Sequence, residues 1–453
     1  MLTAATPHPR WQAAVACTGA VAFPAGLALV ATGQSSALAV LLTIPFAVIV
    51  LIRWAALVHL AVPWAGRRAP PSALKNEDLP VYSVLLPLYD ERDIAPDLVQ
   101  ALRALDYPPD KLEILFITEA HDAGTRAALM SAVLSKEMRI LTVPAGTPRT
   151  KPRALNYALM FARGDLIAVY DAEDVPCPQQ LRLAAGMFAA SDPDLVCVQA
   201  RLSICDPGEG FLARQFALEY ASLFEAILPA LERLGLPILL GGTSNHFRRA
   251  DLEALGAWDS YNVTEDADLG VRISRAGKRV AMLDSETRED APGNAGAWLG
   301  QRTRWLKGWM VTYLVHMRQP AELLRNLGLW RFLGFQAMLG GMILSALVHP
   351  WFYAVALLQL YSGQPVFAGA SGVWAFCWFS LIAGYVVGIA LGLVVAWRSA
   401  GRVPLLSALL VPLYWLAISA ASYRALRELV RRPHHWEKTP HAARTVTPGA
   451  VSP

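Results

Sequence analysis

Acidic side chains gather in the middle of the chain, directly after a short apolar run. Residues 166–170 are apolar and partly β-branched, as in a buried strand, and Asp171, Glu173 and Asp174 follow them. Because alternate side chains share one side of an extended chain, Asp171 and Glu173 can converge on one point while Ala172 turns away. Such a pair of carboxylates suits a divalent cation, Mg²⁺ or Mn²⁺, that takes its remaining ligands from water and substrate phosphates. Taken alone, the stretch is equally typical of a solvated acidic turn.

More carboxylates follow two earlier strands of the same predicted sheet. Residues 81–87 and 112–118 are strand candidates, and residues 94–105 between them have helical periodicity, which predicts a βαβ unit with parallel strands. The side chains at the ends of these strands are Asp90 and Glu91 after the first and Glu119 after the second. Ligands of an open α/β sheet bind at the carboxyl ends of its strands, so we expect a nucleotide site there. The chain has neither a Gly-x-Gly-x-x-Gly nor a Walker motif, so neither a dinucleotide fold nor an ATPase is supported.

A basic helix start and a glycine-rich segment could contact the phosphates instead. Lys151 and Arg153 begin a predicted helix, where the helix dipole and the cationic side chains together favour an anion, although an ordinary exposed helix start is the commoner case. Residues 239–249 contain two adjacent glycines, which would let the backbone approach a ligand closely. A plain surface turn is an equally good interpretation of this second segment.

Two further clusters could act on the transferred group. Thr264 reads as the N-cap of a helix whose first turn carries Glu265 and Asp266, which favour that position because of the helix dipole. Capping is the simpler role, and the sharper hypothesis makes Asp266, with Glu265 beside it, the catalytic base that takes the proton of an acceptor hydroxyl. The second cluster, in a helix just before the C-terminal apolar block, is formed by Gln301, Arg302, Arg304 and Trp305.

The spacing of this last cluster places Gln301, Arg304 and Trp305 on one helix face. Arg and Gln can donate hydrogen bonds to a diphosphate, and an indole can stack on the apolar face of a sugar ring. An amphipathic helix at a membrane interface, with Arg and Trp at the headgroups, is the alternative. Both interpretations can hold for one helix.

Composition limits the classes of protein. The 453 residues leave room for two or three domains, and 55% of them are apolar, with the excess at the two ends. A net charge of +4 is small and spread along the chain, so it gives no argument for nucleic acid as a partner. The five cysteines show no metal-ligand spacing, and we interpret them as reduced and structural.

The N-terminal end predicts a membrane hairpin. Residues 11–31 carry no charge, and a second apolar run at 37–52 follows a short polar break. Positive charges flank the pair and are absent from its connecting loop, so both ends of the hairpin are expected in the cytoplasm. We interpret Arg53 as reaching back to the interface and residues 54–64 as an interfacial stretch.

The C-terminal end predicts further crossings. Residues 333–361, 373–397 and 403–422 are apolar, and a positive cluster follows the last of them, so an even number of crossings is needed to keep that cluster cytoplasmic. Splitting the first run at Pro350 gives four. The predicted division is a hairpin with an interfacial stretch (1–68), a cytosolic α/β domain ending in an interfacial helix (69–325), membrane helices (326–425) and a short cytosolic tail (426–453).

Five short motifs occur in an order that resembles the membrane-bound family-2 glycosyltransferases, which include the cellulose, chitin and hyaluronan synthases. They are Ser-Val-Leu-Leu-Pro-Leu-Tyr-Asp-Glu (83–91), Lys-x-x-x-Leu-Asn (151–156), Asp-x-Glu (171–173), Thr-Glu-Asp (264–266) and Gln-x-x-Arg-Trp (301–305). The resemblance covers residues 80–315 and implies a GT-A fold, an α/β nucleotide-diphospho-sugar transferase domain between membrane helices. Each motif is weak alone, and the order and spacing give them their weight.

The resemblance also implies roles for these residues. Asp171 and Glu173 would hold the metal, Asp266 would be the base, and Lys151 would lie near the nucleotide of a sugar donor, most simply a UDP-sugar. Gln301, Arg304 and Trp305 would hold the diphosphate and the acceptor sugar. The sequence departs from the family pattern at three places, which leaves the nucleotide base and the sugar of the donor open. Thr118-Glu119 stands where Asp-Asp is usual, Asp90 stands where Asn is usual, and Asp-x-Glu replaces Asp-x-Asp.

We therefore expect an inverting hexosyltransferase of the inner (plasma) membrane, with its catalytic domain in the cytoplasm. The leading hypothesis is a processive β-glycan synthase that extends a polysaccharide and could work with accessory export proteins. The alternatives are transfer of a single sugar to a lipid acceptor and a catalytically silent nucleotide-binding membrane protein.

Overall fold

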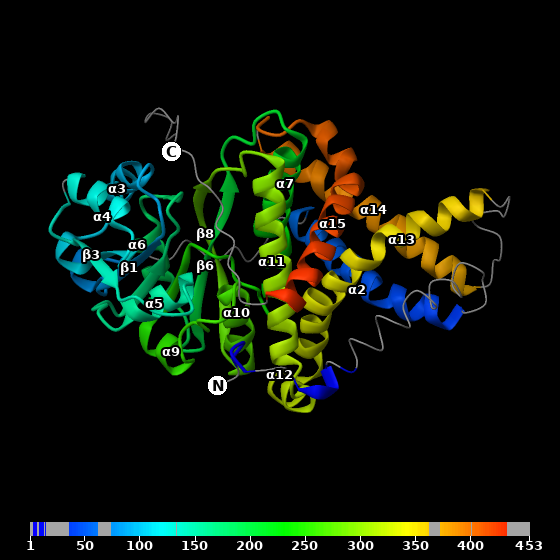
Figure 1. Ribbon diagram of the computed structural model, residues 1–453, viewed down its shortest axis with the longest axis horizontal. Coiled ribbons are helices and arrows are strands. Elements are labelled where there is room, and N and C mark those ends of the chain that lie inside the picture. The colour runs from blue at the N-terminus through cyan, green and yellow to red at the C-terminus, as the bar shows by residue number, and fades with distance from the viewer. Residues whose placement is uncertain are drawn as a thin grey trace.

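The computed structural model describes residues 3–6, 9–12, 14, 36–61, 74–132, 134–361, 372–399 and 401–432. Most of the first apolar run of the predicted hairpin, at 11–31, lies outside these residues, as does the tail from 433 onward. The described part has two regions side by side: a sheet with flanking helices, and a group of long helices (Figure 1).

One mixed sheet of eight strands forms the centre of the first region, in the order β3-β2-β1-β4-β7-β6-β8-β5. Its first four members in that order are parallel, and β7 runs antiparallel between β4 and β6. The strands are β1 (Tyr82–Leu88), β2 (Leu112–Glu119), β3 (Met138–Val143), β4 (Leu166–Val169), β5 (Val175–Pro176), β6 (Leu195–Ile204), β7 (Asn245–Arg248) and β8 (Arg279–Glu289).

The register of the parallel strands fixes where the candidate site lies. Val84 of β1 pairs with Ile114 of β2 on one side and with Ala168 of β4 on the other. The carboxyl ends of these three strands therefore meet at one edge of the sheet. The predicted βαβ unit and parallel sheet are confirmed, with strand ends within one residue of those expected.

Helices cover both faces of the sheet, and α7 and α11 lie between it and the long helices (Figure 1). The helices of this region are η1 (Asn76–Asp78), α3 (Ala95–Arg103), η2 (Pro109–Lys111), α4 (Ala123–Ser131), α5 (Lys151–Leu159), α6 (Gln180–Ala189), α7 (Phe211–Ala221), the π-helix η3 (Ser222–Ile227), α8 (Leu228–Arg233), α9 (Arg249–Ala254), α10 (Glu265–Arg275) and α11 (Ala295–His316).

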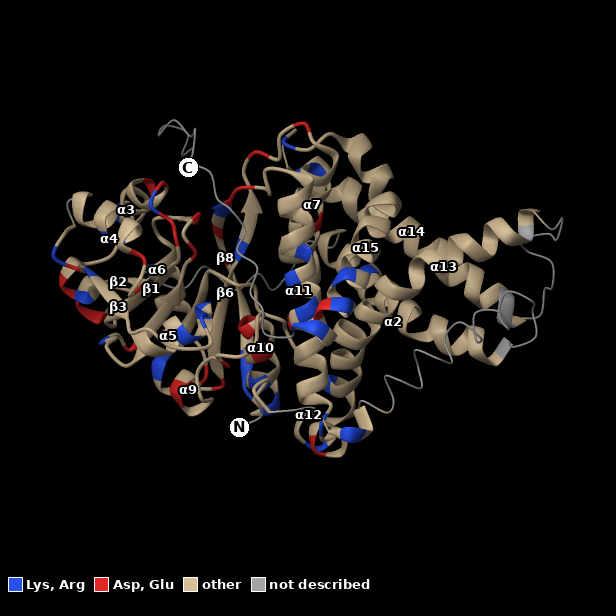
Figure 2. Ribbon diagram, in the orientation of Figure 1, with Lys and Arg blue, Asp and Glu red and all other residues tan. Residues whose placement is uncertain are grey.

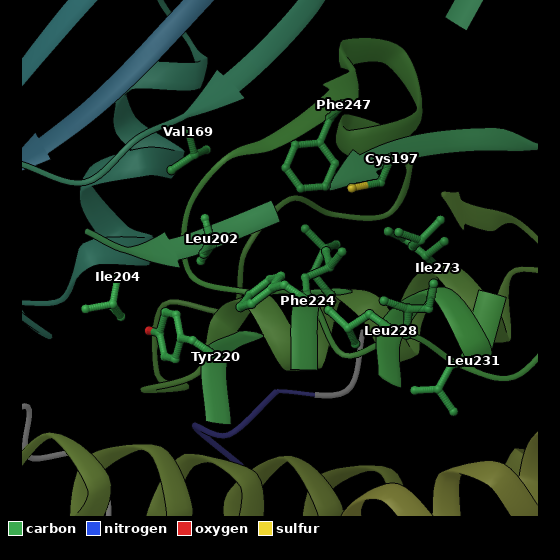
Figure 3. Packing of buried hydrophobic residues seen from close by; sticks show 14 of the residues in the cluster. Val169, Cys197, Leu202, Ile204, Tyr220, Phe224, Leu228, Leu231, Phe247 and Ile273 are labelled. Atoms are coloured by element: carbon green, nitrogen blue, oxygen red, sulfur yellow. The ribbon is translucent and has the colours of Figure 1, made fainter. Parts of the chain in front are cut away.

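Two hydrophobic clusters pack on the two faces of the sheet, which explains why its central strands are apolar at most positions. In β1, Val84 belongs to the cluster with α3 and α6, whereas the next residue, Leu85, belongs to the cluster with α5 and η3. Figure 3 shows the second cluster, where Phe224 and Leu228 lie between the helices and the sheet residues Cys197 and Phe247.

The long helices carry few charges, as Figure 2 shows for α13 and α14. They are α2 (Ser36–Ala61), α12 (Pro320–Phe335), the π-helix η4 (Gln336–Gly341), α13 (Met342–Tyr361), α14 (Gly372–Arg398), η5 (Leu405–Leu410) and α15 (Val411–Arg431). Within the described ranges, four helical stretches are long and apolar enough to cross a membrane: one before the sheet region and three after it. This number fits membrane association.

Two sequence-based expectations about these helices are wrong. The apolar run at 333–361 does not break at Pro350, because α13 continues through that residue; membrane helices tolerate proline since neighbouring groups satisfy the freed carbonyl. The break lies earlier, at Gly328, whose φ of 69° interrupts α12. Residues 54–61 are not a separate interfacial stretch, because α2 runs without interruption to Ala61.

Candidate active site

The turn after β4 presents two carboxylates and buries a third. Asp171 and Glu173 are partly exposed and line a cavity, while Ala172 and Asp174 between and after them are buried. Asp174 folds back into the turn, where it accepts hydrogen bonds from the backbone N–H of Asp171 at 2.7 Å and from the Thr243 hydroxyl. Burial and the carboxylates of Asp171 and Glu173 raise the pKa of Asp174 well above its usual value. The predicted alternation of side chains is thus present.

This pair of carboxylates fits a divalent cation only in part. Within the described ranges, no group of three or more His, Cys, Asp and Glu side chains is arranged to hold a metal ion by itself. Asp171 and Glu173 offer hard oxygen ligands, and Mg²⁺ or Mn²⁺ would need its remaining ligands from water and a diphosphate. The donor set therefore fits a metal that binds together with a nucleotide.

Lys151, the first residue of α5, reaches into this turn. Its ammonium group pairs with Asp171 and donates a hydrogen bond to the Gly242 carbonyl at 2.7 Å. Burial disfavours the ammonium, but the neighbouring carboxylates of Asp171 and Glu265 hold the pKa of Lys151 above its usual range. The predicted basic helix start is therefore part of the acidic site.

Asp266 and Glu265 lie in the first turn of α10, opposite the turn after β4. Thr264 occupies the N-cap position, as predicted, but its side chain makes no capping hydrogen bond. Burial raises the pKa of Asp266 to about 6, against the hydrogen bond from the Ala267 N–H and the charge of Lys151. Burial and the charge of Asp266 raise the pKa of Glu265 to about 7. Both carboxyl groups therefore gain or lose a proton close to neutral pH, as a general acid or base requires.

Gly242 brings these groups together. A methyl group on its Cα would lie 3.4 Å from Asp266 Oδ2, 3.8 Å from Lys151 Nζ and 3.9 Å from Asp171 Oδ2. Of the two interpretations of the glycine-rich segment, close approach of the backbone to the site is the one the structure shows. Any side chain at this position would occupy the space between the candidate base and the candidate metal ligand.

Helix α11 closes the site from the side of the long helices. Gln301, Arg304 and Trp305 line the same cavity as the carboxylates, which confirms the predicted shared face. Burial lowers the pKa of Arg304, against the charges of Asp171 and Glu265. The Trp305 ring extends an aromatic stack, with centroids 6.0 Å from Phe216 and 6.1 Å from Tyr220.

Arg302 has a different environment from its neighbours on α11. Its side chain is buried, pairs with both carboxylate oxygens of Glu219, one of them at 3.0 Å, and lies 4.6 Å from the Trp305 ring centroid. Arg302 also lines the cavity, and its guanidinium is engaged in an ion pair that supports the aromatic stack, so its predicted role in substrate binding stays a prediction.

The remaining predicted residues lie at the far side of the site. Glu119 is buried, lines the cavity and lies 3.5 Å from the guanidinium of Arg153. Glu91 also lines the cavity, whereas Asp90 is exposed and outside its lining, with a φ of 55°. The backbone N–H of Asp90 donates to Asp122 at 2.6 Å, which fixes this loop.

All of these groups face one cavity of about 900 Å³. It extends from the ends of the parallel strands past Trp305 and continues between the long helices, where Met338, Met342, His349, Leu391 and Trp415 line it. The cavity therefore joins the acidic site to the apolar helical region.

Several residues of this cavity were not predicted as site residues. Arg149 lines it from the loop before α5, Glu219 from α7 and Glu289 from the end of β8, and Arg53 of α2 lines it rather than reaching the interface. Burial and the charges of Asp174 and Glu173 raise the pKa of Glu289 well above its usual value. Glu219 and Glu289 are isolated charges far from the motifs, so no sequence signal marks them. Arg149 lies two residues before the motif that begins at Lys151, and Arg53 is a charge within an apolar run, so these two could have been singled out.

The family model and the similar proteins agree on one family. Residues 80–308 match the model of the family described as glycosyltransferase like family 2. A probable glycosyltransferase of Bacillus subtilis is 26% identical over 264 residues, covering 57% of this chain and 62% of that protein. A beta-monoglucosyldiacylglycerol synthase of Synechocystis is 27% identical over 269 residues, covering 57% of this chain and 55% of that protein.

A UDP-forming cellulose synthase catalytic subunit of Komagataeibacter sucrofermentans is 26% identical over 312 residues, covering 67% of this chain and 40% of that protein. The chain thus spans less than two thirds of each of these relatives. Among solved structures, a mannosyltransferase of Pyrobaculum calidifontis in complex with GDP-Man and Mn²⁺ superposes with a TM-score of 0.56 at 21% identity. That superposition covers 87% of this chain and 98% of the other, and it shows a shared fold.

Proposed function

Because the chain belongs to glycosyltransferase family 2 and has the predicted GT-A fold, we propose that it transfers a hexose with inversion from a nucleotide sugar to the hydroxyl of a membrane lipid. The observation that carries this proposal is the cavity that joins the acidic site to the apolar helices. We further propose that the enzyme lies in the inner (plasma) membrane with its sheet region in the cytoplasm.

The chemistry follows from the residues at the sheet edge. Asp266 takes the proton of the acceptor hydroxyl, whose oxygen attacks the anomeric carbon as the bond to the diphosphate breaks on the opposite side. Lys151 and Arg304 provide positive charge for the departing diphosphate. A divalent metal, held by Asp171 and Glu173, would neutralise charge on the same diphosphate. Support for its use comes from the Mn²⁺ and GDP-Man bound to the Pyrobaculum calidifontis mannosyltransferase.

A lipid acceptor is favoured by the inner lining of the cavity. The side chains between the long helices are mostly hydrocarbon, and they include Phe46, Ile49, Met338, Met342, Leu391 and Ile418. Acyl or prenyl chains would gain by replacing water along such a wall, whereas a hydrated glycan needs many polar partners. The relative from Synechocystis, whose name describes a lipid product, agrees with this choice.

Processive synthesis of a polysaccharide remains the second candidate, because of Trp305. Its indole lines the cavity beside the acidic site, where it could stack on the terminal sugar of a chain. The cellulose synthase relative agrees with this alternative. Both candidates use the same base, diphosphate contacts and metal ligands, so only the acceptor separates them.

Product analysis tests the proposal. The purified full chain in detergent is incubated with Mn²⁺ or Mg²⁺, a bacterial lipid extract and a panel of radiolabelled UDP- and GDP-sugars, with Asp266→Asn as the inactive control. We expect label in the organic phase, in a product of one added hexose. Label in an insoluble or high-molecular-weight fraction would instead establish the second candidate, and label in neither fraction with any donor would contradict both.

A further inference from the structure

Arg53 places a guanidinium group at the inner end of the cavity, among the long helices. It lies in α2, about 12 Å along the helix axis from the end of that helix at Ala61. Its Cζ atom is 4.5 Å from the ring centroid of Trp415, so one face of the guanidinium is covered by an indole. No hydrogen bond or ion pair joins Arg53 to another residue in the described ranges. Charged groups in apolar helical layers are costly, and they mark binding sites when they face a cavity.

The charges around this end of the cavity leave one positive charge unbalanced. Glu219 is the carboxylate that lines this end of the cavity. It already pairs with Arg302 through both oxygens and accepts a hydrogen bond from the Tyr414 hydroxyl at 2.7 Å. Two guanidinium groups therefore face a single carboxylate at this end of the described cavity lining. A ligand with one negative charge would complete the balance.

His349 supplies a second polar group at the same place. Its side chain is 3% exposed and lines the cavity, and its Nε2 atom has no hydrogen-bond partner in the part of the chain that the structure describes. The imidazole packs edge-on against Tyr353, Tyr385 and Trp415, with centroids 5.2 to 5.8 Å away. A buried polar atom without a partner is destabilising, and a ligand oxygen or hydroxyl could supply the missing hydrogen bond.

We propose that Arg53 and His349 form a subsite for the phosphate group of a membrane lipid. A planar guanidinium matches phosphate oxygens with parallel N–H donors, and phosphate is the common anion of membrane lipids. The inference deepens the proposed function and rests on it: the acceptor would place its hydroxyl at Asp266, its phosphate at Arg53, and its chains along the hydrocarbon wall. The acceptor class is thus a lipid whose hydroxylated headgroup is joined to its chains through phosphate, rather than a neutral diacylglycerol.

Direct lipid binding tests the subsite without any need for turnover. Native mass spectrometry of the full chain in detergent measures retention of dioleoyl phosphatidic acid, of farnesyl phosphate and of dioleoylglycerol. We expect Arg53→Gln to weaken binding of the phosphate lipids about tenfold or more and to leave dioleoylglycerol unchanged. The matched control is Arg325→Gln, at an exposed position of α12, which should bind all three as the wild type does.

A second variant guards against misfolding. Arg53→Lys keeps the charge and should retain most of the phosphate-lipid binding, and the thermal midpoints of both variants are compared with that of the wild type. Preference for phosphatidic acid or for farnesyl phosphate would identify the lipid source, whereas full displacement by millimolar inorganic phosphate would overturn the lipid assignment. Equal binding of phosphate lipids by wild type and Arg53→Gln would also overturn it.

Failure of the subsite and failure of the proposed function give different results. If Arg53→Gln transfers sugar to lipid as well as the wild type and binds phosphate lipids equally, the subsite is wrong and the function stands. If phosphate lipids bind through Arg53 but no lipid is ever glycosylated, the subsite stands and the proposed acceptor is wrong.

Discussion

At the scale of single residues, Asp266 is the group on which the proposed chemistry depends most. Its Oδ1 atom accepts a hydrogen bond from the Ala267 N–H at 2.7 Å, while Oδ2 faces Gly242 and the site. Asp266→Asn keeps the shape and removes the basic oxygen, so we expect the turnover rate to fall about 10²- to 10⁴-fold with nucleotide affinity nearly unchanged. Asp97→Asn, at an exposed position of α3, is the matched control. Wild-type turnover of Asp266→Asn would refute the assignment.

The raised pKa values of this pair predict a pH dependence. The base acts only when deprotonated, and burial moves the pKa of Asp266 up to about 6 and that of Glu265 to about 7. Activity should therefore be full above pH 7 and should decrease as pH falls through 7 to 6, far above the range of an exposed carboxyl. The measurement is kcat/KM against pH at saturating Mn²⁺. A profile that stays flat down to pH 5 would contradict it.

The two carboxylates after β4 predict dependence on a metal. Chelation should abolish transfer, and Asp171→Asn should raise the Mn²⁺ concentration for half-maximal activity by at least about tenfold, since loss of even an outer partner of a metal ligand costs that much. Glu173→Asp retains a carboxylate and should be milder than Glu173→Gln. Mn²⁺ binding followed by electron paramagnetic resonance, in the presence of nucleotide, gives a readout independent of turnover. Unchanged Mn²⁺ dependence of Asp171→Asn would reject the site.

The limits of sequence reasoning are clear for neighbouring residues of α11. Helical spacing correctly placed Trp305 and Gln301 on one face, because that depends only on the period of the helix. The role of Arg302 depends on Glu219, a residue of α7 that only the fold brings near. The buried position of Asp174 likewise depends on Thr243, which precedes a different strand. The local sequence pattern predicts which side chains share one face of a helix. Contacts with residues far away in the sequence decide which charged side chains can reach a ligand.

At the scale of elements, the parallel strands β1, β2 and β4 were predictable because both of their faces are buried, whereas β3, whose middle residues are partly exposed, was not predicted. Each of the three predicted strands is an apolar run bounded by polar turns, and the chain supplies no competing helical period there. The sequence analysis did not predict that β7 pairs antiparallel with β4, because local composition does not determine which strand pairs with which. It also did not predict the π-helices η3 and η4, because local composition does not determine the helix type. The part of the site that was predictable is the set of carboxylates at the ends of the parallel strands.

Contact between α11 and α10 should be sensitive to one glycine. A Cβ atom on Gly308 would lie 2.4 Å from two side-chain atoms of Thr264, the residue before Glu265 and Asp266. In an open helix, Gly→Ala stabilises by about 1 kcal/mol, but overpacking costs about 1–3 kcal/mol, so the clash decides the sign. We expect Gly308→Ala to lower both the thermal midpoint and the turnover rate. Gly372→Ala, with nothing within 4 Å, is the control; equal stability of both variants would contradict the packing argument.

At the scale of the whole molecule, helix count and membrane topology are separate questions. Composition correctly identified the apolar segments. Whether a helix continues through Pro350, and where α15 lies, depends on packing between helices. Helix α15 runs beside α11: Glu428 pairs with Lys307 at 3.1 Å, and Tyr414 accepts a hydrogen bond from Trp298 at 3.2 Å. Since α11 belongs to the sheet region, both ends of α15 lie on that side.

This arrangement predicts two crossings after the sheet region, with α15 along the cytoplasmic interface. The ends of α14 and α2 coincide, because Arg398 donates to the Leu60 carbonyl at 2.9 Å, so α14 returns the chain to the cytoplasmic side. This predicted number is even, as the basic cluster at the end of α15 requires, and it differs from the four crossings expected from the sequence. Green fluorescent protein fused to the C-terminal end of the chain should therefore fluoresce in a bacterial host. Alkaline phosphatase should be active when inserted after Tyr361 and inactive at the C-terminal end, and activity at the C-terminal end would mean that α15 crosses the membrane.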